Sequence, residues 1–159
     1  MEKLSIFVET HGCQMNEYDS DRIINSLSAH PVKNPADADV VIVNTCAIRD
    51  KADHKAVSAI GRYKKYKISN PNLIIGMAGC VAQLYGKKLI KQIPHLDFVI
   101  GPREIGKLKE LIKDIKDSSK FKKINTSMDI EEIFKVSPYH EEGKINGFVS
   151  IQQGCNKKC

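Results

Sequence analysis

Short apolar runs alternate with segments of helical spacing over the first 117 residues. Runs rich in β-branched residues, typical of buried strands, occur at 4–8, 39–43, 73–78 and 97–100, and a very short edge strand is predicted near Val32. Segments with apolar residues three and four apart, typical of helices with one buried side, occur at 16–29, at 49–67, after residue 80 and from residue 102 onward. This alternation predicts an α/β fold, a Rossmann- or flavodoxin-like parallel sheet with helices on both faces.

Three cysteines occupy the same place in this pattern. Cys13, Cys46 and Cys80 each follow the carboxyl end of a predicted strand, at separations of 33 and 34 residues, about one βα repeat. Cys13 lies on a turn that Gly12 permits, and Asn16 is a suitable N-cap for the next helix. A single cysteine at such a turn is more often a small buried residue. Since parallel strands end at one edge of a sheet, three of them predict a shared site.

Thiolates bind soft metals, so the shared site predicts zinc or an iron–sulfur cluster. Structural zinc usually takes four ligands, often in closely spaced pairs, and these three cysteines are far apart in the chain. His11 is the nearest candidate for a fourth ligand, and we interpret it as an ordinary polar residue at the mouth of the site. A 4Fe–4S cluster can be held by three protein ligands, which leaves one iron open.

The alternating pattern weakens after residue 117. The segment 118–146 is rich in Lys, Ser, Asp and Glu and is predicted to be a connector with a short helix around 129–134. A new strand is predicted at 147–151, and Cys155 and Cys159 follow it with C-x3-C spacing. We therefore expect domains at 1–117 and 147–159, the second being only the beginning of a larger unit.

Composition narrows the possible partners and compartment. The net charge of +6 makes an anionic partner plausible, while the absence of Trp and the low aromatic content argue against a stacking platform for bases. We interpret the basic face of the predicted helix 49–67 as solvated surface rather than a nucleic-acid contact; it comprises Lys51, Lys55, Arg62, Lys64 and Lys65. Five cysteines without a signal peptide or a membrane-length apolar run predict a reducing, cytoplasmic location.

The cysteine-bearing motifs together resemble the amino-terminal part of the radical S-adenosylmethionine methylthiotransferases. The matching segments are HGCQMNEYDS at 11–20, NTCAIR at 44–49, GCVA at 79–82 and GCNKKC at 154–159. The last segment resembles the first two cysteines of the C-x3-C-x2-C motif, whose third cysteine would fall beyond residue 159. Within the family, Cys-Gln-Met-Asn followed by Tyr-Asp-Ser resembles the branch that acts on isopentenyladenosine in tRNA.

The resemblance implies two 4Fe–4S clusters and S-adenosylmethionine as cofactors. Cys13, Cys46 and Cys80 would hold an auxiliary cluster whose open iron carries the sulfur to be inserted. Cys155 and Cys159, with the missing third cysteine, would hold the radical cluster. Cleavage of one S-adenosylmethionine there would give the radical that abstracts hydrogen from carbon 2 of the adenine next to the anticodon. A second S-adenosylmethionine would supply the methyl group.

The resemblance also implies tRNA as the partner, an electron donor such as flavodoxin or ferredoxin, and a monomer without a membrane contact. By this resemblance, the predicted strand 147–151 would be the first strand of a truncated radical-SAM barrel. The rest of the barrel and the RNA-binding domain of the family have no counterpart in this sequence, so we expect the chain alone to be inactive. Three alternatives remain: a methylthiotransferase for another tRNA base or a ribosomal-protein aspartate, an iron–sulfur carrier module, and a nucleotide- or RNA-binding domain with structural cysteines. The last would require a glycine-rich phosphate loop, and none is present.

Overall fold

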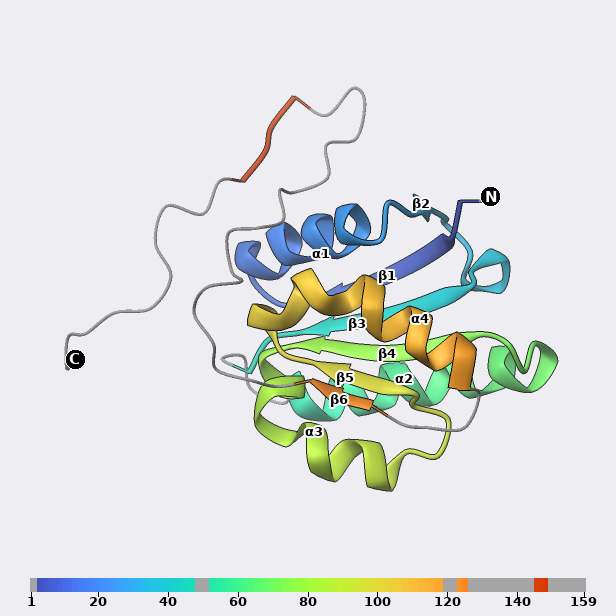
Figure 1. Ribbon diagram of the computed structural model, residues 1–159. Coiled ribbons are helices and arrows are strands. Elements are labelled where there is room, and N and C mark those ends of the chain that lie inside the picture. The colour runs from blue at the N-terminus through green and yellow to red at the C-terminus, as the bar shows by residue number, and fades with distance from the viewer. Residues whose placement is uncertain (1–2, 48–51, 119–122, 126–144, 149–159) are drawn as a thin grey trace.

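A computed structural model of the chain describes residues 3–47, 52–118, 123–125 and 145–148. Its centre is a parallel sheet with the strand order β2-β1-β3-β4-β5-β6 (Figure 1). The strands are β1 (Ser5–His11), β2 (His30–Pro31), β3 (Val40–Thr45), β4 (Ile74–Gly79), β5 (Phe98–Ile100) and β6 (Lys123–Asn125). The predicted parallel α/β sheet is confirmed. The edge strand predicted near Val32 is β2, which ends one residue earlier.

Four α-helices cover the two faces of the sheet. They are α1 (Gln14–Ser26), α2 (Ala52–Ser69), α3 (Cys80–Gln92) and α4 (Leu108–Ser118), and short 3-10 turns lie at η1 (Pro35–Asp37) and η2 (Pro102–Lys107). Figure 1 shows α1 and α4 on one face, with α2 and α3 on the other. In the part of the chain that the structure describes, none of the helices combines the length and the apolar character needed to span a membrane.

The central strands are buried along their whole length because helices cover both of their faces. All six residues of β3 and all six of β4 are buried. Alternate side chains of each strand enter different cores. Val41 and Val43 pack with α2 and α3, whereas Val40 and Ile42 pack with α1 and α4.

The strand register brings three carboxyl ends to the same level. His11 of β1 lies beside Thr45 of β3, and Thr45 lies beside Gly79 of β4. The chain first places β2 on one side of β1 and then continues with β3 on the other side, so the sheet changes its direction of growth there. In sheets of this kind, ligands bind outside the carboxyl ends of the strands at such a point.

Two local details differ from the sequence prediction. The predicted connector 118–146 contains β6, which pairs with β5; its sequence Lys-Ile-Asn has only one apolar residue, so no strand pattern is visible. Pro102 begins a 3-10 turn, and the α-helix starts only at Leu108, because Gly106 disfavours an early α-helical turn. The predicted helix 129–134, most of the strand 147–151 and Cys155 and Cys159 lie outside the described residues.

Candidate metal centre

The three cysteines of the described chain lie on adjacent strand ends. Cys13 follows β1 by two residues, Cys46 directly follows β3, and Cys80 directly follows β4. Cys46 is buried, the other two are half-buried, and none of the three forms a disulfide. Cys80 is the first residue of α3 rather than a loop residue, because the helix begins without an intervening turn. The predicted placement at one edge is confirmed, while a role as ligands stays a prediction.

Two glycines allow the cysteine-bearing segments to approach each other closely. A Cβ atom on Gly12 would lie 2.8 Å from Cβ of Cys46 and 2.1 Å from Oδ1 of Asn16. Gly79 adopts a φ of +93°, and a Cβ atom there would lie 2.3 Å from the carbonyl oxygen of Thr45. A larger residue at either position would displace these neighbours, so both glycines permit the close approach of the segments.

A buried amide network connects the Cys13 turn to the end of β3. Asn16 is 3% exposed, and its Oδ1 accepts a hydrogen bond from the backbone N–H of Cys13 at 3.2 Å. Its Nδ2 donates to Oδ1 of Asn44 at 3.3 Å and to the carbonyl oxygen of Thr45 at 3.1 Å. Nδ2 of Asn44 donates in return to the carbonyl oxygen of Asn16 at 2.7 Å. No pattern in the sequence indicates this pairing, since Asn16 and Asn44 are far apart in the chain.

The predicted N-cap of α1 is wrong by one turn. The helix begins at Gln14 with Cys13 as its N-cap, and Asn16 is the third helical residue. Asn16 still satisfies an N–H group at the helix end, but it does so from inside the helix, through the N–H of Cys13. This arrangement places Cys13 directly at the start of α1.

Similar side-chain bonds connect β3 to β4 and to the body of α1. The hydroxyl of Thr45 donates to the carbonyl oxygen of Ala78 at 2.8 Å, two residues before Cys80. Nδ2 of Asn44 also donates to Oγ of Ser20 at 2.9 Å, and Ser20 shares a hydrogen bond of 2.7 Å with Thr10. The ends of β1, β3 and β4 are therefore joined by side chains as well as by the backbone ladder.

The electrostatic surroundings keep the Cys80 thiol protonated in the metal-free protein. Burial raises the pKa of Cys80 above its ordinary value, although a hydrogen bond from the backbone N–H of Ala47 opposes this. Negative charge on the Cys46, Asp19 and Cys13 side chains raises it further. Metal binding at this thiol would displace a proton.

A buried ion pair lies in the same helix as the Cys13 turn. Asp19 Oδ1 is 3.1 Å from a guanidinium nitrogen of Arg22, which is 1% exposed. Burial raises the pKa of Asp19 to about 6, and the neighbouring Arg22 charge opposes that rise. At neutral pH the carboxylate is ionised and the pair is formed.

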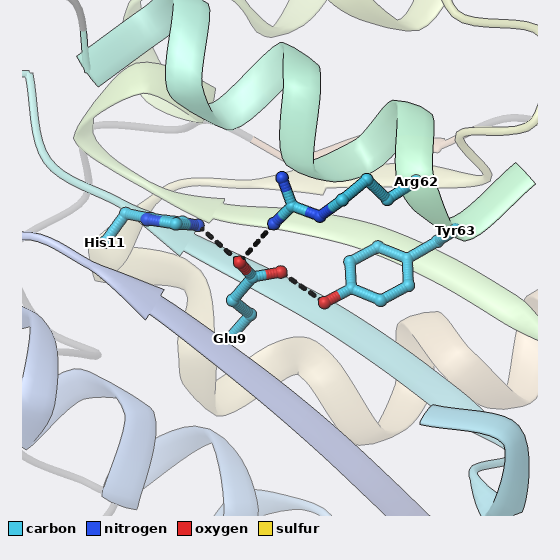
Figure 2. Close-up of polar contacts among 4 residues, drawn as sticks. All are labelled: Glu9, His11, Arg62 and Tyr63. Carbon is cyan, nitrogen blue, oxygen red and sulfur yellow. Dashed lines mark hydrogen bonds and ion pairs between the residues drawn. The ribbon is translucent and has the colours of Figure 1, made fainter. Parts of the chain in front are cut away.

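His11 pairs with Glu9, which also binds residues of α2. Its Nε2 lies 2.8 Å from Oε1 of Glu9, and the Arg62 guanidinium contacts the same oxygen. The hydroxyl of Tyr63 donates to Oε2 of Glu9; burial first, and then this carboxylate, raise the pKa of Tyr63 well above its usual value. Figure 2 shows His11, Arg62 and Tyr63 around the carboxylate of Glu9. The cluster fastens α2 to β1, and it agrees with His11 being a polar residue beside the site.

The described residues do not surround a single metal ion, and three thiols are the donor type that an iron–sulfur cluster takes. Among the residues that the structure describes, no three His, Cys, Asp or Glu side chains surround the position of one ion. A tetrahedral zinc site would need four ligands about one centre, and His11 is engaged by Glu9. Cys13, Cys46 and Cys80, on neighbouring strand ends, would be the residues to hold such a cluster, which tolerates three protein thiolates.

The basic face of α2 makes contacts within the chain. Lys55, Lys64 and Lys65 are exposed, and Nζ of Lys65 lies 4.9 Å from the centre of the Tyr66 ring. Arg62 is bound to Glu9. Lys51 lies outside the described residues. These contacts suit a solvated helix surface, and an interaction with nucleic acid stays untested.

Comparison with known proteins identifies the family. The chain is 39% identical over 158 residues to a tRNA-2-methylthio-N(6)-dimethylallyladenosine synthase of Janthinobacterium sp. (strain Marseille), which covers 97% of this chain and 35% of that protein. The enzymes of the same name from Stutzerimonas stutzeri (strain A1501) and Xanthomonas campestris pv. campestris (strain B100) are 40% and 41% identical, each over 97% of this chain and over 36% and 32% of their own lengths. The chain thus spans about a third of the curated relatives it matches. These matches confirm the resemblance to methylthiotransferases. Residues 5–101 match the model of the family described as uncharacterized protein family UPF0004, and the chain belongs to that family.

Proposed function

We propose that this chain forms the amino-terminal, cluster-binding part of a tRNA methylthiotransferase. The observation that carries the proposal is that Cys13, Cys46 and Cys80 follow the carboxyl ends of three adjacent strands, and that these ends lie beside one another in the sheet. The printed names of the relatives support the same activity, and each relative is about three times as long as this chain.

In this proposal the three thiolates bind a 4Fe–4S cluster. The cluster, when bound, supplies an open iron at which sulfur is held for transfer to the substrate. The protein holds Cys13 at the start of α1, Cys46 directly after the buried strand β3, and Cys80 at the start of α3. Helix starts favour negative charge, which suits thiolates and a cluster that are anionic together.

The proposed substrate is tRNA that carries N6-dimethylallyladenosine, the isopentenyladenosine next to the anticodon. The names of the relatives support this choice over another tRNA base or a ribosomal-protein aspartate. Cys155 and Cys159 are proposed as two ligands of a second 4Fe–4S cluster, at which S-adenosylmethionine is cleaved. An electron donor such as flavodoxin or ferredoxin, a monomeric state and the cytoplasm complete the proposal.

A chimera tests this proposal at the level of the whole enzyme. The segment of the Janthinobacterium enzyme that aligns with this chain is replaced by residues 1–159, and the chimera is expressed in a bacterial strain that lacks the 2-methylthio modification. Mass spectrometry of tRNA nucleosides should detect the 2-methylthio product. The same chimera with Cys46→Ala should leave only the unmodified dimethylallyladenosine. An active Cys46→Ala chimera would refute the proposal.

A further inference from the structure

Asn16 and Asn44 meet where the Cys13 turn joins the end of the neighbouring strand. Each side-chain amide binds the other residue: Nδ2 of Asn16 lies 3.3 Å from Oδ1 of Asn44, and Nδ2 of Asn44 lies 2.7 Å from the Asn16 carbonyl oxygen. Both side chains are buried, with residue exposures of 3% and 0%. Burying an amide costs free energy unless its polar atoms are hydrogen-bonded, so the two side chains are held in the one arrangement that satisfies them.

The orientation of the Asn16 amide is fixed by its partners. Its oxygen accepts from the N–H of Cys13, and its nitrogen donates to the carbonyl oxygen of Thr45. A rotated amide would place two donors against each other at Cys13 and two acceptors against each other at Thr45. One side chain therefore fixes the residue before Cys46 relative to the backbone of Cys13.

We propose that Asn16 and Asn44 are positioning residues of the metal centre, and that they set the location of the Cys13 thiol relative to Cys46. This inference rests on the proposed function. The cube requires each thiolate at its own iron, and Cys13 lies on a turn after the end of β1. Asn16 is the side chain that holds the Cys13 N–H, and it links that N–H to β3. Without the amide pair, the fold persists and the Cys13 arm of the site loosens.

The opposite edge of the sheet offers a matched control. There, Oδ2 of Asp39 accepts from the backbone N–H of Ser5 at 2.8 Å and from the Ser5 hydroxyl at 2.7 Å. This bond also joins a residue beside β3 to β1, far from the cysteines. Asp39→Ala therefore removes a side-chain link between the same two strands, an exposed one, without touching the candidate site.

The experiment uses the 159-residue chain with Asn16→Ala, Asn16→Asp, Asn44→Ala and Asp39→Ala. Asn16→Asp keeps the oxygen that accepts from Cys13 but loses both hydrogen bonds donated by Nδ2. After anaerobic reconstitution with iron and sulfide, the loss of the cluster to a chelator is followed by absorption. Second-sphere changes typically weaken metal binding by about 10- to 100-fold, and we expect the cluster to leave faster by that factor in the three asparagine variants. Asp39→Ala should match the wild type.

A second readout needs no metal. In the metal-free protein, hydrogen exchange of the Cys13 amide should be about tenfold faster or more in Asn16→Ala, because its acceptor is lost. Exchange in β3 should stay as in the wild type. Far-UV circular dichroism establishes that each variant is folded. If Asn16→Ala is not folded, the rates of cluster loss in Asn44→Ala and Asn16→Asp carry the test, because both variants keep the acceptor of the Cys13 N–H.

The outcomes separate the inference from the proposed function. Equal rates of cluster loss in all variants would overturn the positioning role while leaving the cluster itself in place. Unfolding of all three asparagine variants would also overturn it, since the pair would then be a requirement of the fold. A wild type that takes up no cluster would refute the proposed function, and the exchange of the Cys13 amide would still report on the amide pair.

Discussion

Gly79 is the position at which a single methyl group should most directly disturb the cysteine-bearing edge. Its φ of +93° lies in the region that residues with a Cβ atom rarely adopt. The added Cβ of Gly79→Ala would lie 2.3 Å from the carbonyl oxygen of Thr45 and 2.9 Å from its backbone nitrogen. Both neighbours are backbone atoms of a fully buried strand, so they cannot turn aside as a flexible side chain would.

The expected cost combines two terms. The conformation of Gly79, with φ +93° and ψ −163°, is one that glycine alone adopts readily, and it costs a residue with a Cβ atom roughly 1–3 kcal/mol. Displacing packed backbone adds roughly 1–3 kcal/mol, as for overpacking in a core. We therefore expect Gly79→Ala to lower the free energy of unfolding by about 2–6 kcal/mol. Cys80 is the next residue, so the same change should also impair cluster uptake.

Gly61 provides a control with the opposite sign. It lies inside α2, and a Cβ atom there would meet nothing within 4 Å. Alanine at this position should raise the free energy of unfolding by about 0.5–1 kcal/mol, since glycine is a poor helix former. Urea unfolding of the metal-free chain, followed by circular dichroism, measures both variants. A Gly79→Ala protein as stable as the wild type, or shifted in the same direction as Gly61→Ala, would refute the reasoning.

Three further predictions concern charge and thiol chemistry. Because the pKa of Asp19 is raised to about 6, the folded state holds an extra proton between about pH 4 and 6. The free energy of unfolding of the wild type, relative to that of Asp19→Asn, should therefore fall by on the order of 2–3 kcal/mol from pH 4 to pH 7. A difference in urea unfolding that stays constant with pH would contradict this. Since the pKa of Cys80 is raised, its alkylation by iodoacetamide in the metal-free chain should be slower at pH 7 than that of an ordinary exposed thiol, as peptide mass spectrometry would show. Charge reversal of Lys64 and Lys65 in the chimeric enzyme should leave cluster content unchanged; weaker tRNA binding with a smaller salt slope would establish an RNA contact, and unchanged affinity across a salt series would establish a solvated surface.

The sequence predicts the sheet and the cysteine edge because both follow from short-range patterns. The buried strands β3 and β4 are continuous apolar runs, and parallel strands with helical crossovers must end at a common edge. The repeat of about one βα unit between Cys13, Cys46 and Cys80 is therefore enough to predict their approach.

The remaining features depend on contacts between distant parts of the chain. The three residues of β6 gain their strand conformation from pairing with β5, and their own side chains carry no strand pattern. Asn16 and Asn44 are ordinary polar residues until the fold buries them together. The same holds for Glu9, whose partners Arg62 and Tyr63 come from the middle of α2. Such pairs leave no periodic signal in a single sequence.

The most direct test of the central claim is the iron and sulfide content of the reconstituted chain, compared between Cys46→Ala and Cys155→Ala. The wild type should take up one oxygen-sensitive 4Fe–4S cluster, seen also in its absorption spectrum. Cys46→Ala should lose that cluster, because two thiolates are a poor substitute for three. Cys155→Ala should keep nearly all of its iron, since Cys155 belongs to a different proposed site. An equal loss of iron in both variants would contradict the division of the five cysteines into a group of three and a group of two.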